Sequence, residues 1–173
     1  MLRSILLLPL LCCAPLMGQT FPHLAGETAN GAAVDLPNAT AKAYTVIGIA
    51  YSKKASPLLE EWYEPAYLRF VAKHGLFAGA YDADVYFVPL FVGLNKAAYD
   101  PSLKRFRKSA SPEIVAHVVF SKDDLDPLKE TLEMEDSDIP YFFVLDANGV
   151  IVHRTRGAFT EDKLDAIEAI LLQ

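Results

Sequence analysis

Residues Asp138 to Gly157 read DIPYFFVLDANGVIVHRTRG and carry the clearest structural signal of the sequence. This stretch holds two runs rich in β-branched and aromatic residues, 141–146 and 150–155, on either side of the pair Asn148-Gly149. An Asn-Gly pair between two such runs is the strongest short-range signal of a β-hairpin. The first run begins with five apolar residues, so both of its faces are apolar. We therefore expect it to be a central strand of an α/β sheet, covered on both sides.

The surroundings of this hairpin resemble the C-terminal half of thioredoxin-like proteins. Ile139-Pro140 leads into the first run, and an amphipathic segment over 160–172 predicts a closing helix after Gly157. In thioredoxin-like proteins the corresponding proline is cis and lies beside the redox site; whether Pro140 itself is cis stays open. The resemblance implies a thioredoxin-like three-layer α/β sandwich, with a mixed central sheet and a C-terminal β-hairpin plus helix.

The N-terminus has the layout of a secretory signal. One basic residue, Arg3, precedes an apolar run over 5–17 that is too short to cross a bilayer as a stable helix, and a small residue, Gly18, follows. We expect cleavage near Gly18, which leaves one thioredoxin-like domain over 19–173. The mature chain would then be exported, either periplasmic or secreted, without a transmembrane segment.

The chain has two cysteines, Cys12 and Cys13, and both lie inside the expected signal. A lipid anchor on one of them is the alternative to a cleaved signal, although the preceding residues, Leu11 and Cys12, are not the small ones usual at such a site. Without these cysteines an exported protein has no disulfide and no thiol chemistry of its own. This is the most specific functional statement that the residues support.

The charge of the chain argues against nucleic acid and anionic membranes as partners. Loss of Arg3 with the signal takes the formal net charge from −6 to −7, and there is no basic run. The four histidines lie apart, without the spacing of metal ligands, so we expect surface or structural roles for them. The fold could still bring them together, but the sequence indicates no cofactor.

A strand and a helix should meet at the centre of the fold. The run Tyr44–Tyr51 predicts a buried strand, and a long helix should follow from Ser56, as N-cap before Pro57, to Gly75. Pro65 should bend this helix unless a turn begins there. Apolar side chains at helical spacing predict its buried face: Leu59, Trp62, Ala66 and Phe70.

The order of the remaining elements agrees with the resemblance. A hairpin with its turn at Asn30-Gly31 is similar to the opening of the peroxiredoxin and TlpA-like branch of thioredoxin-like families. After the first helix we expect a strand over 85–92 that ends or shifts near Pro89, and then a helix over 96–108 that is basic on one side. A short apolar run over 114–120 should lie near the sheet edge or dock as a loop-strand, and another helix should follow over 121–135.

The junction between the first strand and its helix is the candidate site. In thioredoxin-like enzymes the redox cysteines lie there, where the helix dipole lowers the thiol pKa. Here the junction has no cysteine, so no catalytic residue is carried over, and no G-x-S-x-G elbow supports a serine nucleophile. Because the proline segment of active relatives pairs with extended substrate backbone, we expect a binding surface formed by Ser52, Lys53, Lys54, Ala55, Ser56, Ile139 and Pro140.

The favoured function is a redox-inactive, exported module that binds a protein or peptide partner. Trp62-x-x-Pro65 and the run from Phe142 to Ile151 also resemble thioredoxin-like assembly factors of the mitochondrial ATP synthase, which lack a redox pair, although the targeting signal differs. This second resemblance implies a partner-handling role. The alternatives are an oxidoreductase that uses partner thiols, a thiol-free hydrolase on the same scaffold, and a structural component of an envelope assembly.

Overall fold

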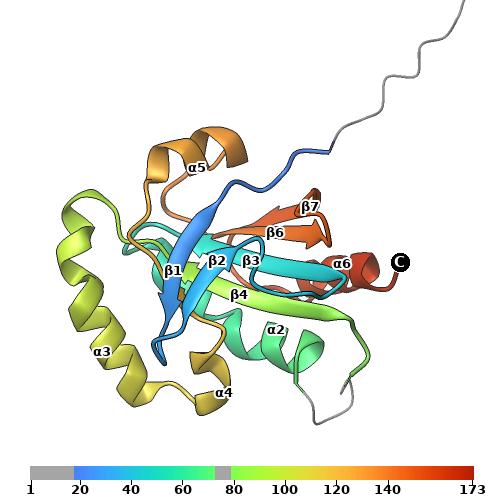
Figure 1. Cartoon of the computed structure of the whole chain (residues 1–173), viewed down its shortest axis with the longest axis horizontal. Helices are drawn as coiled ribbons and strands as arrows, with labels where there is room; N and C mark the ends of the chain where they lie inside the picture. The colour runs from blue at the N-terminus through green and yellow to red at the C-terminus, as the bar shows by residue number, and fades with distance from the viewer. Residues whose placement is uncertain (1–17, 73–78) are drawn as a thin grey trace, which may run out of the picture.

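The computed structural model of the protein describes residues 18–72 and 79–173. The expected signal peptide, apart from Gly18, and both cysteines lie outside the described residues, and so does Gly75, the expected end of the first helix. The described residues form a β-sheet that carries helices on its two faces (Figure 1).

The sheet at the centre of the fold is four-stranded and mixed. In spatial order it holds β4 (Ala83–Pro89), β3 (Tyr44–Ala50), β6 (Tyr141–Asp146) and β7 (Ile151–Arg156). β3 runs parallel to β4 and antiparallel to β6, and β6 forms an antiparallel hairpin with β7. The predicted mixed sheet with a C-terminal hairpin is confirmed, and β6 is an inner strand whose first five residues are buried.

A smaller sheet continues the central one beyond β4. In spatial order it holds β5 (Val119–Phe120), β1 (Leu24–Thr28) and β2 (Ala33–Leu36), and β1 and β2 form the predicted N-terminal hairpin. Bridges from Val118 to Phe87 and from Ser121 to Leu90 set the segment around β5 parallel to β4. Of the two alternatives expected for the run 114–120, the structure has the docked loop-strand and not the edge position: the two-residue β5 lies between β1 and β4. The last three residues of this run are apolar and buried, which suits an inner position between β4 and β1.

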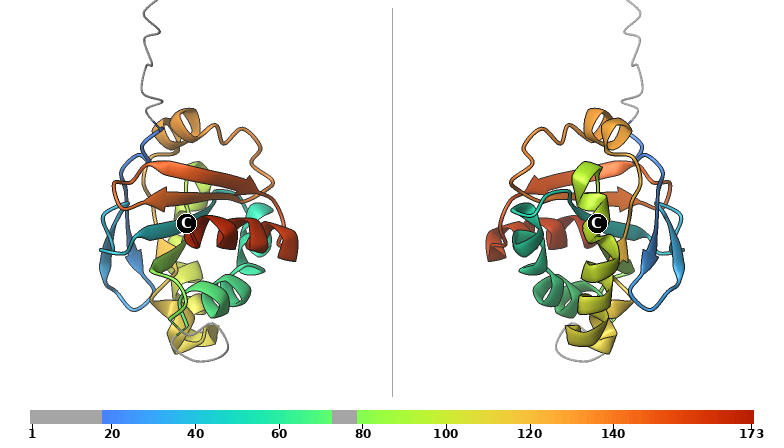
Figure 2. Two further views of the ribbon diagram at one scale, coloured as in Figure 1. Left: turned by 90° about the vertical axis from the view of Figure 1, so that its right-hand side faces the viewer. Right: turned by 90° about the vertical axis from the view of Figure 1, so that its left-hand side faces the viewer.

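Helices cover both faces of the sheet (Figure 2). One face packs against α1 (Ala55–Glu60), α2 (Tyr63–Phe70), α3 (Tyr99–Ser109) and α6 (Glu161–Leu171), and the other face packs against α5 (Leu125–Leu132). Two short elements flank α3 along the chain, the 3-10 helix η1 (Gly93–Ala98) and α4 (Pro112–Val115). The three layers are those of the predicted sandwich, and α6 is the predicted closing helix.

Prolines fix where four of the helices begin. The third residue of each is a proline, where the backbone N–H has no partner inside the helix: Pro57 in α1, Pro65 in α2, Pro101 in α3 and Pro127 in α5. The single helix expected from Ser56 is consequently two helices, because α1 ends at Glu60 and α2 begins at Tyr63. For the same reason the segment 96–108 is divided into η1 and α3, and 121–135 contains a shorter helix, α5.

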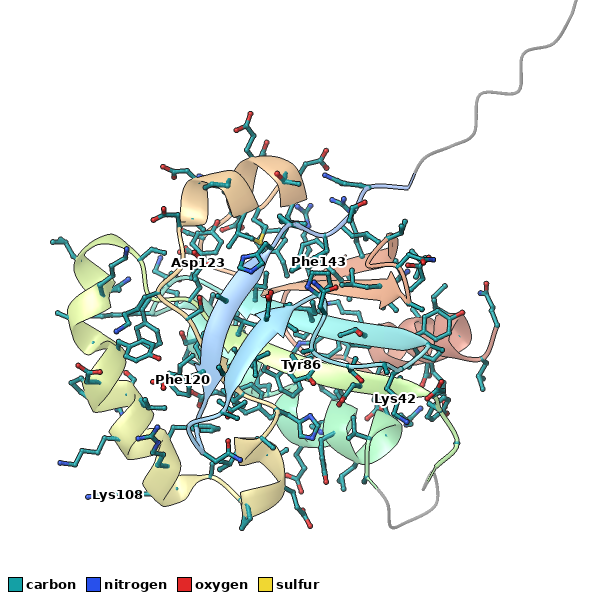
Figure 3. All side chains as sticks on the ribbon, viewed as in Figure 1. Lys42, Tyr86, Lys108, Phe120, Asp123 and Phe143 are labelled. Atoms are coloured by element: carbon teal, nitrogen blue, oxygen red, sulfur yellow. The ribbon has the colours of Figure 1, made fainter. Side chains whose placement is uncertain are left out.

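Apolar side chains fill a layer on each face of the sheet. Phe120 belongs to the layer beneath α3 and Phe143 to the layer beneath α5 (Figure 3). The four residues predicted to face the sheet from the first helix are all buried: Leu59, Trp62, Ala66 and Phe70. Gly48 of β3 lies where the first helix packs on the sheet, and a Cβ at this position would come within 2.5 Å of a ring carbon of Phe142. The inner strand therefore needs a glycine at this position.

The turn of the C-terminal hairpin is built as its sequence predicts. The Asp146 Oδ1 atom accepts hydrogen bonds from the backbone N–H groups of Asn148 at 2.8 Å and Val150 at 2.9 Å. Gly149 has a φ of 75°, in the left-handed region that glycine adopts without a steric penalty. The first described residues dock here as well, because the N–H of Phe21 donates to the Gly149 carbonyl at 2.8 Å.

The proline before β6 differs from its counterpart in the resemblance. The Ile139-Pro140 bond is not cis; among the described residues the cis bond is Leu36-Pro37. The trans form is the usual one for a bond that precedes proline. Pro140 still leads directly into the strand, and its carbonyl accepts a hydrogen bond from the N–H of Gly157 at 2.8 Å.

Candidate functional site

The junction between β3 and α1 is held by two serines. The Ser52 hydroxyl accepts from the backbone N–H of Lys54 at 3.2 Å and of Ala55 at 3.1 Å, and the Ser56 hydroxyl donates to the Ser52 carbonyl at 2.8 Å. Ser56 is therefore inside the helix and is not its N-cap, which corrects the prediction: Ser52 is the side chain that accepts the free N–H groups before the first turn. The hydroxyls organise the backbone of the junction.

A salt bridge connects the junction to the segment before β6. Lys54 Nζ lies 2.8 Å from Asp138 Oδ2, and hydrogen bonding to this carboxylate, with its charge, raises the pKa of Lys54. Both side chains are largely exposed, so the pair adds little to stability. The contact shows that the junction lies beside the segment that leads to Ile139 and Pro140, an adjacency that the resemblance implies.

Two tyrosines anchor the loop that carries Asp138. The Tyr51 hydroxyl donates to the Met134 carbonyl at 2.7 Å, and the Tyr141 hydroxyl accepts from the N–H of Asp136 at 2.7 Å. Burial, with the nearby Tyr141 and Asp136, raises the pKa of Tyr51 to about 12. Tyr51 therefore remains a neutral hydrogen-bond donor at physiological pH, and the loop is fixed to the end of β3.

The seven predicted site residues are not equally available to a partner. Ala55 and Pro140 are buried, so their side chains can only support the surface. Lys53 and Lys54 are exposed, and the remaining three are half-buried: Ser52, Ser56 and Ile139. The backbone N–H and carbonyl of Ile139 make no hydrogen bond to any residue in the described part of the chain.

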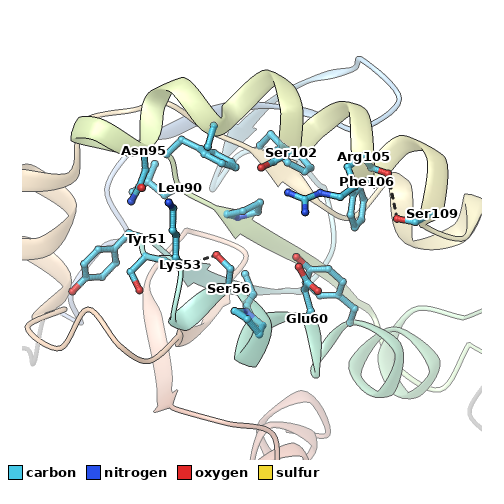
Figure 4. A pocket seen from close by; sticks show the side chains of 18 residues that line it. Tyr51, Lys53, Ser56, Glu60, Leu90, Asn95, Ser102, Arg105, Phe106 and Ser109 are labelled. Carbon is cyan, nitrogen blue, oxygen red and sulfur yellow. Dashed lines mark hydrogen bonds between the residues drawn. The ribbon is translucent and has the colours of Figure 1, made fainter.

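A cavity of about 790 Å³ opens beside the junction (Figure 4). Its walls are the junction with α1 and α2 on one side and η1 with α3 on the other, and β4 and β5 form its floor. The cavity is lined by five aromatic residues, Tyr51, Tyr63, Phe91, Phe106 and Phe120, and by three charged ones, Lys53, Glu60 and Arg105. Ser52 and Ser56 also line it, whereas Lys54, Ile139 and Pro140 do not. The predicted surface is thus divided: one part of it lines the cavity, and the part around Lys54 and Ile139 lies outside the cavity.

The α3 wall of this cavity was not expected from the sequence, because the segment 96–108 indicated only a helix with a basic side. The signal was present, because Ser102, Arg105, Phe106 and Ser109 follow the i, i+3, i+4, i+7 spacing of one helix face, and all four line the cavity. The pattern does not show that this helix face is turned toward the junction, because the orientation of α3 depends on packing between segments far apart in the chain.

The described histidines have separate surroundings. His23 Nε2 lies 2.9 Å from Asp35 Oδ1, and His117 Nδ1 lies 2.8 Å from the Val85 carbonyl oxygen. The Nε2 atom of His153 is buried without a hydrogen-bond partner. Among the residues of 18–72 and 79–173, no group of three or more His, Cys, Asp or Glu is placed to hold a metal ion. His74 lies outside the described residues.

Comparisons with known proteins identify the fold. No family model and no curated protein sequence matches the chain, but solved structures do. A candidate thiol:disulfide interchange protein DsbE from Chlorobium tepidum is 17% identical over 90% of this chain and 94% of its own, with a TM-score of 0.59. A thiol-disulfide oxidoreductase from Bacteroides fragilis is 12% identical over 88% and 99%, with a TM-score of 0.54.

A third similar structure is BsSco, a member of the Sco family of cytochrome c oxidase assembly proteins with a disulfide switch. It is 9% identical over 88% of this chain and 94% of its own, with a TM-score of 0.55. These likenesses show that the chain has a thioredoxin-like fold, as its sequence predicted. Within the described part of the chain, every helix is too short or too polar to span a membrane.

Proposed function

From this thioredoxin-like fold, we propose that the protein binds an extended peptide segment of a protein partner, without redox chemistry of its own, after export from the cytoplasm. The single observation that carries the proposal is the junction itself. It lies beside the proline segment through the 2.8 Å contact of Lys54 with Asp138, and it has serines and lysines where the resemblance implies cysteines.

The chemistry of the surface supports peptide binding. Ile139 is half-buried and its backbone donor and acceptor have no partner among the described residues, so an extended chain could pair with them. Lys54 and Asp138 place one charge of each sign beside that backbone. Such a surface favours a peptide that adds backbone hydrogen bonds at Ile139 and a charged side chain next to the salt bridge.

Similar proteins are described as acting through disulfides, and BsSco as belonging to a family of assembly proteins. The 160 residues after Cys13 contain no cysteine, so the same chemistry would have to come from a partner. Retention of the fold without the thiols supports a role in which binding alone is used. The export signal over 1–18 is part of the proposal.

The test is selection from a random peptide library on the purified protein, followed by affinity measurements on variants. Peptides should be enriched on the wild-type protein and should lose about tenfold or more of their affinity for a Lys54→Glu, Ile139→Asp variant. The matched control is Lys129→Glu, Val152→Asp, which makes the same charge change at an exposed lysine of α5 and introduces the same aspartate at an exposed β-branched apolar residue of β7. Unchanged melting temperatures would show that both variants are folded.

Two outcomes would contradict the proposal. One is the failure of any peptide to be enriched above a control protein. The other is equal affinity of the selected peptides for the wild-type protein and the junction variant.

A further inference from the structure

The floor of the cavity beside the junction is aromatic. The ring of Phe120 lies 5.8 Å from that of Phe91, nearly parallel at 13°, and 5.5 Å from that of Phe106. Phe91 and Phe106 are only half-buried, so they offer ring surface to the cavity. A volume of about 790 Å³ is in the range of sites that enclose small organic ligands. Offset stacking on such rings favours a flat aromatic ligand.

Two cations stand on opposite walls above this floor. Lys53 projects from the junction and Arg105 from α3 (Figure 4). Neither side chain makes an ion pair or hydrogen bond with a described residue. α3 carries four basic residues and one acidic residue, in a chain with a formal net charge of −6. The helix α3 is therefore a positive region of an acidic protein, which attracts anions, and Arg105 is the one of its four basic residues that lines the cavity.

A carboxylate in the cavity, that of Glu60, limits the number of negative charges that the ligand can carry. Glu60 lines the wall opposite α3, so the three charged side chains sum to one positive charge. A monoanion balances this charge, whereas a dianion would place excess negative charge near Glu60. The hydroxyls of Ser102 and Ser109 and the amide of Asn95 add neutral hydrogen-bonding groups along the η1 and α3 wall.

We infer that the cavity binds a small aromatic monocarboxylate, with its ring against Phe91 and Phe106, which the buried Phe120 supports from below, and its carboxylate between Lys53 and Arg105. Guanidinium and ammonium groups are the usual partners of carboxylates, and a site that excludes part of the water strengthens both contacts. This ligand site adjoins the peptide surface: Lys54 and Ile139 do not line the cavity, whereas Ser52, Lys53 and Ser56 belong to both.

The experiment is a calorimetric titration of the purified protein with naphthalene-2-carboxylate and with its neutral isostere, naphthalene-2-carboxamide. We expect the carboxylate to bind about tenfold more tightly than the carboxamide. Arg105→Gln and Lys53→Gln should each remove about three- to tenfold of the carboxylate affinity and leave the carboxamide affinity unchanged. No peptide is present, so the result is independent of the peptide-binding proposal.

Lys108→Gln is the matched control. Lys108 is an exposed cation of the same helix that does not line the cavity, and its side chain extends away from the fold (Figure 3). This variant should bind the carboxylate as the wild-type protein does. The inference is overturned if the carboxylate does not saturate the protein, if the carboxamide binds equally well, or if Lys108→Gln weakens binding as much as Arg105→Gln. Because all three substituted side chains are exposed, the variants are expected to fold.

Discussion

Lys54 Nζ lies 2.8 Å from Asp138 Oδ2, and this contact joins two segments that are 84 positions apart in the chain. Lys54 belongs to the junction where β3 meets α1, and Asp138 precedes the proline that leads into β6. In the proposed function the pair positions both halves of a peptide-binding surface. Its contribution to stability is small, because both side chains are exposed.

A charge swap tests this positioning role. Lys54→Glu and Asp138→Lys should each weaken binding of a selected peptide, because each places two like charges beside Ile139. The double variant restores an opposite pair and should recover part of the affinity for peptides whose own contact is with the backbone of Ile139. Fluorescence anisotropy with a labelled peptide gives the affinities. Equal affinity in all four proteins would show that the pair has no part in binding.

Gly48→Ala should destabilise the protein by about 1–3 kcal/mol, because the space between β3, α1 and β6 is already filled by side chains that the new methyl group would overlap. Its Cβ would lie 2.5 Å from Phe142 Cε1 and 3.0 Å from Leu59 Cδ1. Urea unfolding followed by circular dichroism measures the loss. In a Phe142→Leu background the same change should cost less, since part of the ring is gone. An equal cost in both backgrounds would mean that the Phe142 ring is not what excludes the methyl group.

His153 should make the protein less stable in mild acid. Burial lowers the pKa of this imidazole, whose Nε2 has no hydrogen-bond partner. The unfolded chain then binds a proton more readily than the folded one, so stability is lost as the pH falls below the ordinary pKa of histidine toward the lowered value. Between about pH 7.5 and pH 5, the free energy of unfolding should fall more for the wild-type protein than for His153→Leu. Parallel curves for the two proteins would contradict this expectation.

The purified protein should not reduce insulin with dithiothreitol as electron donor, and it should not consume peroxide. The residues described, 18–72 and 79–173, include the whole junction, and it has no thiol. Introducing cysteines as Lys54→Cys and Pro57→Cys places a C-x-x-C pair at the start of α1 and should create measurable insulin reduction. Insulin reduction by the native protein would overturn the thiol-free account and direct attention to chemistry by other residues.

Local signals explain how much of the fold could be predicted. Asn148-Gly149 and the apolar run before it specify a hairpin and an inner strand without any long-range information. The spacing of Trp62 and Ala66 likewise identified a buried helix face. The start of that helix was missed because Ser56-Pro57 fits an N-cap pattern, whereas the structure uses Ser52, one turn earlier.

Long-range packing explains what could not be predicted. The segment around Val119 is too short for its pattern to reveal that both of its neighbours, β4 and β1, lie far away in sequence. The cavity could not be predicted for the same reason, because Lys53 and Arg105 face a common space only when α3 packs over the junction. The pair Lys54 and Asp138 was unforeseen, although the adjacency of the junction and the proline segment was expected from the resemblance.

The most direct test of the central claim is to map where a selected peptide binds, by following backbone amide shifts of the isotope-labelled protein during a titration. We expect the largest shifts on residues 52–56 and on Asp138 and Ile139, and no shifts on α5 and β7. Shifts confined to other surfaces, or no saturable shifts at all, would contradict the claim that the junction binds an extended peptide.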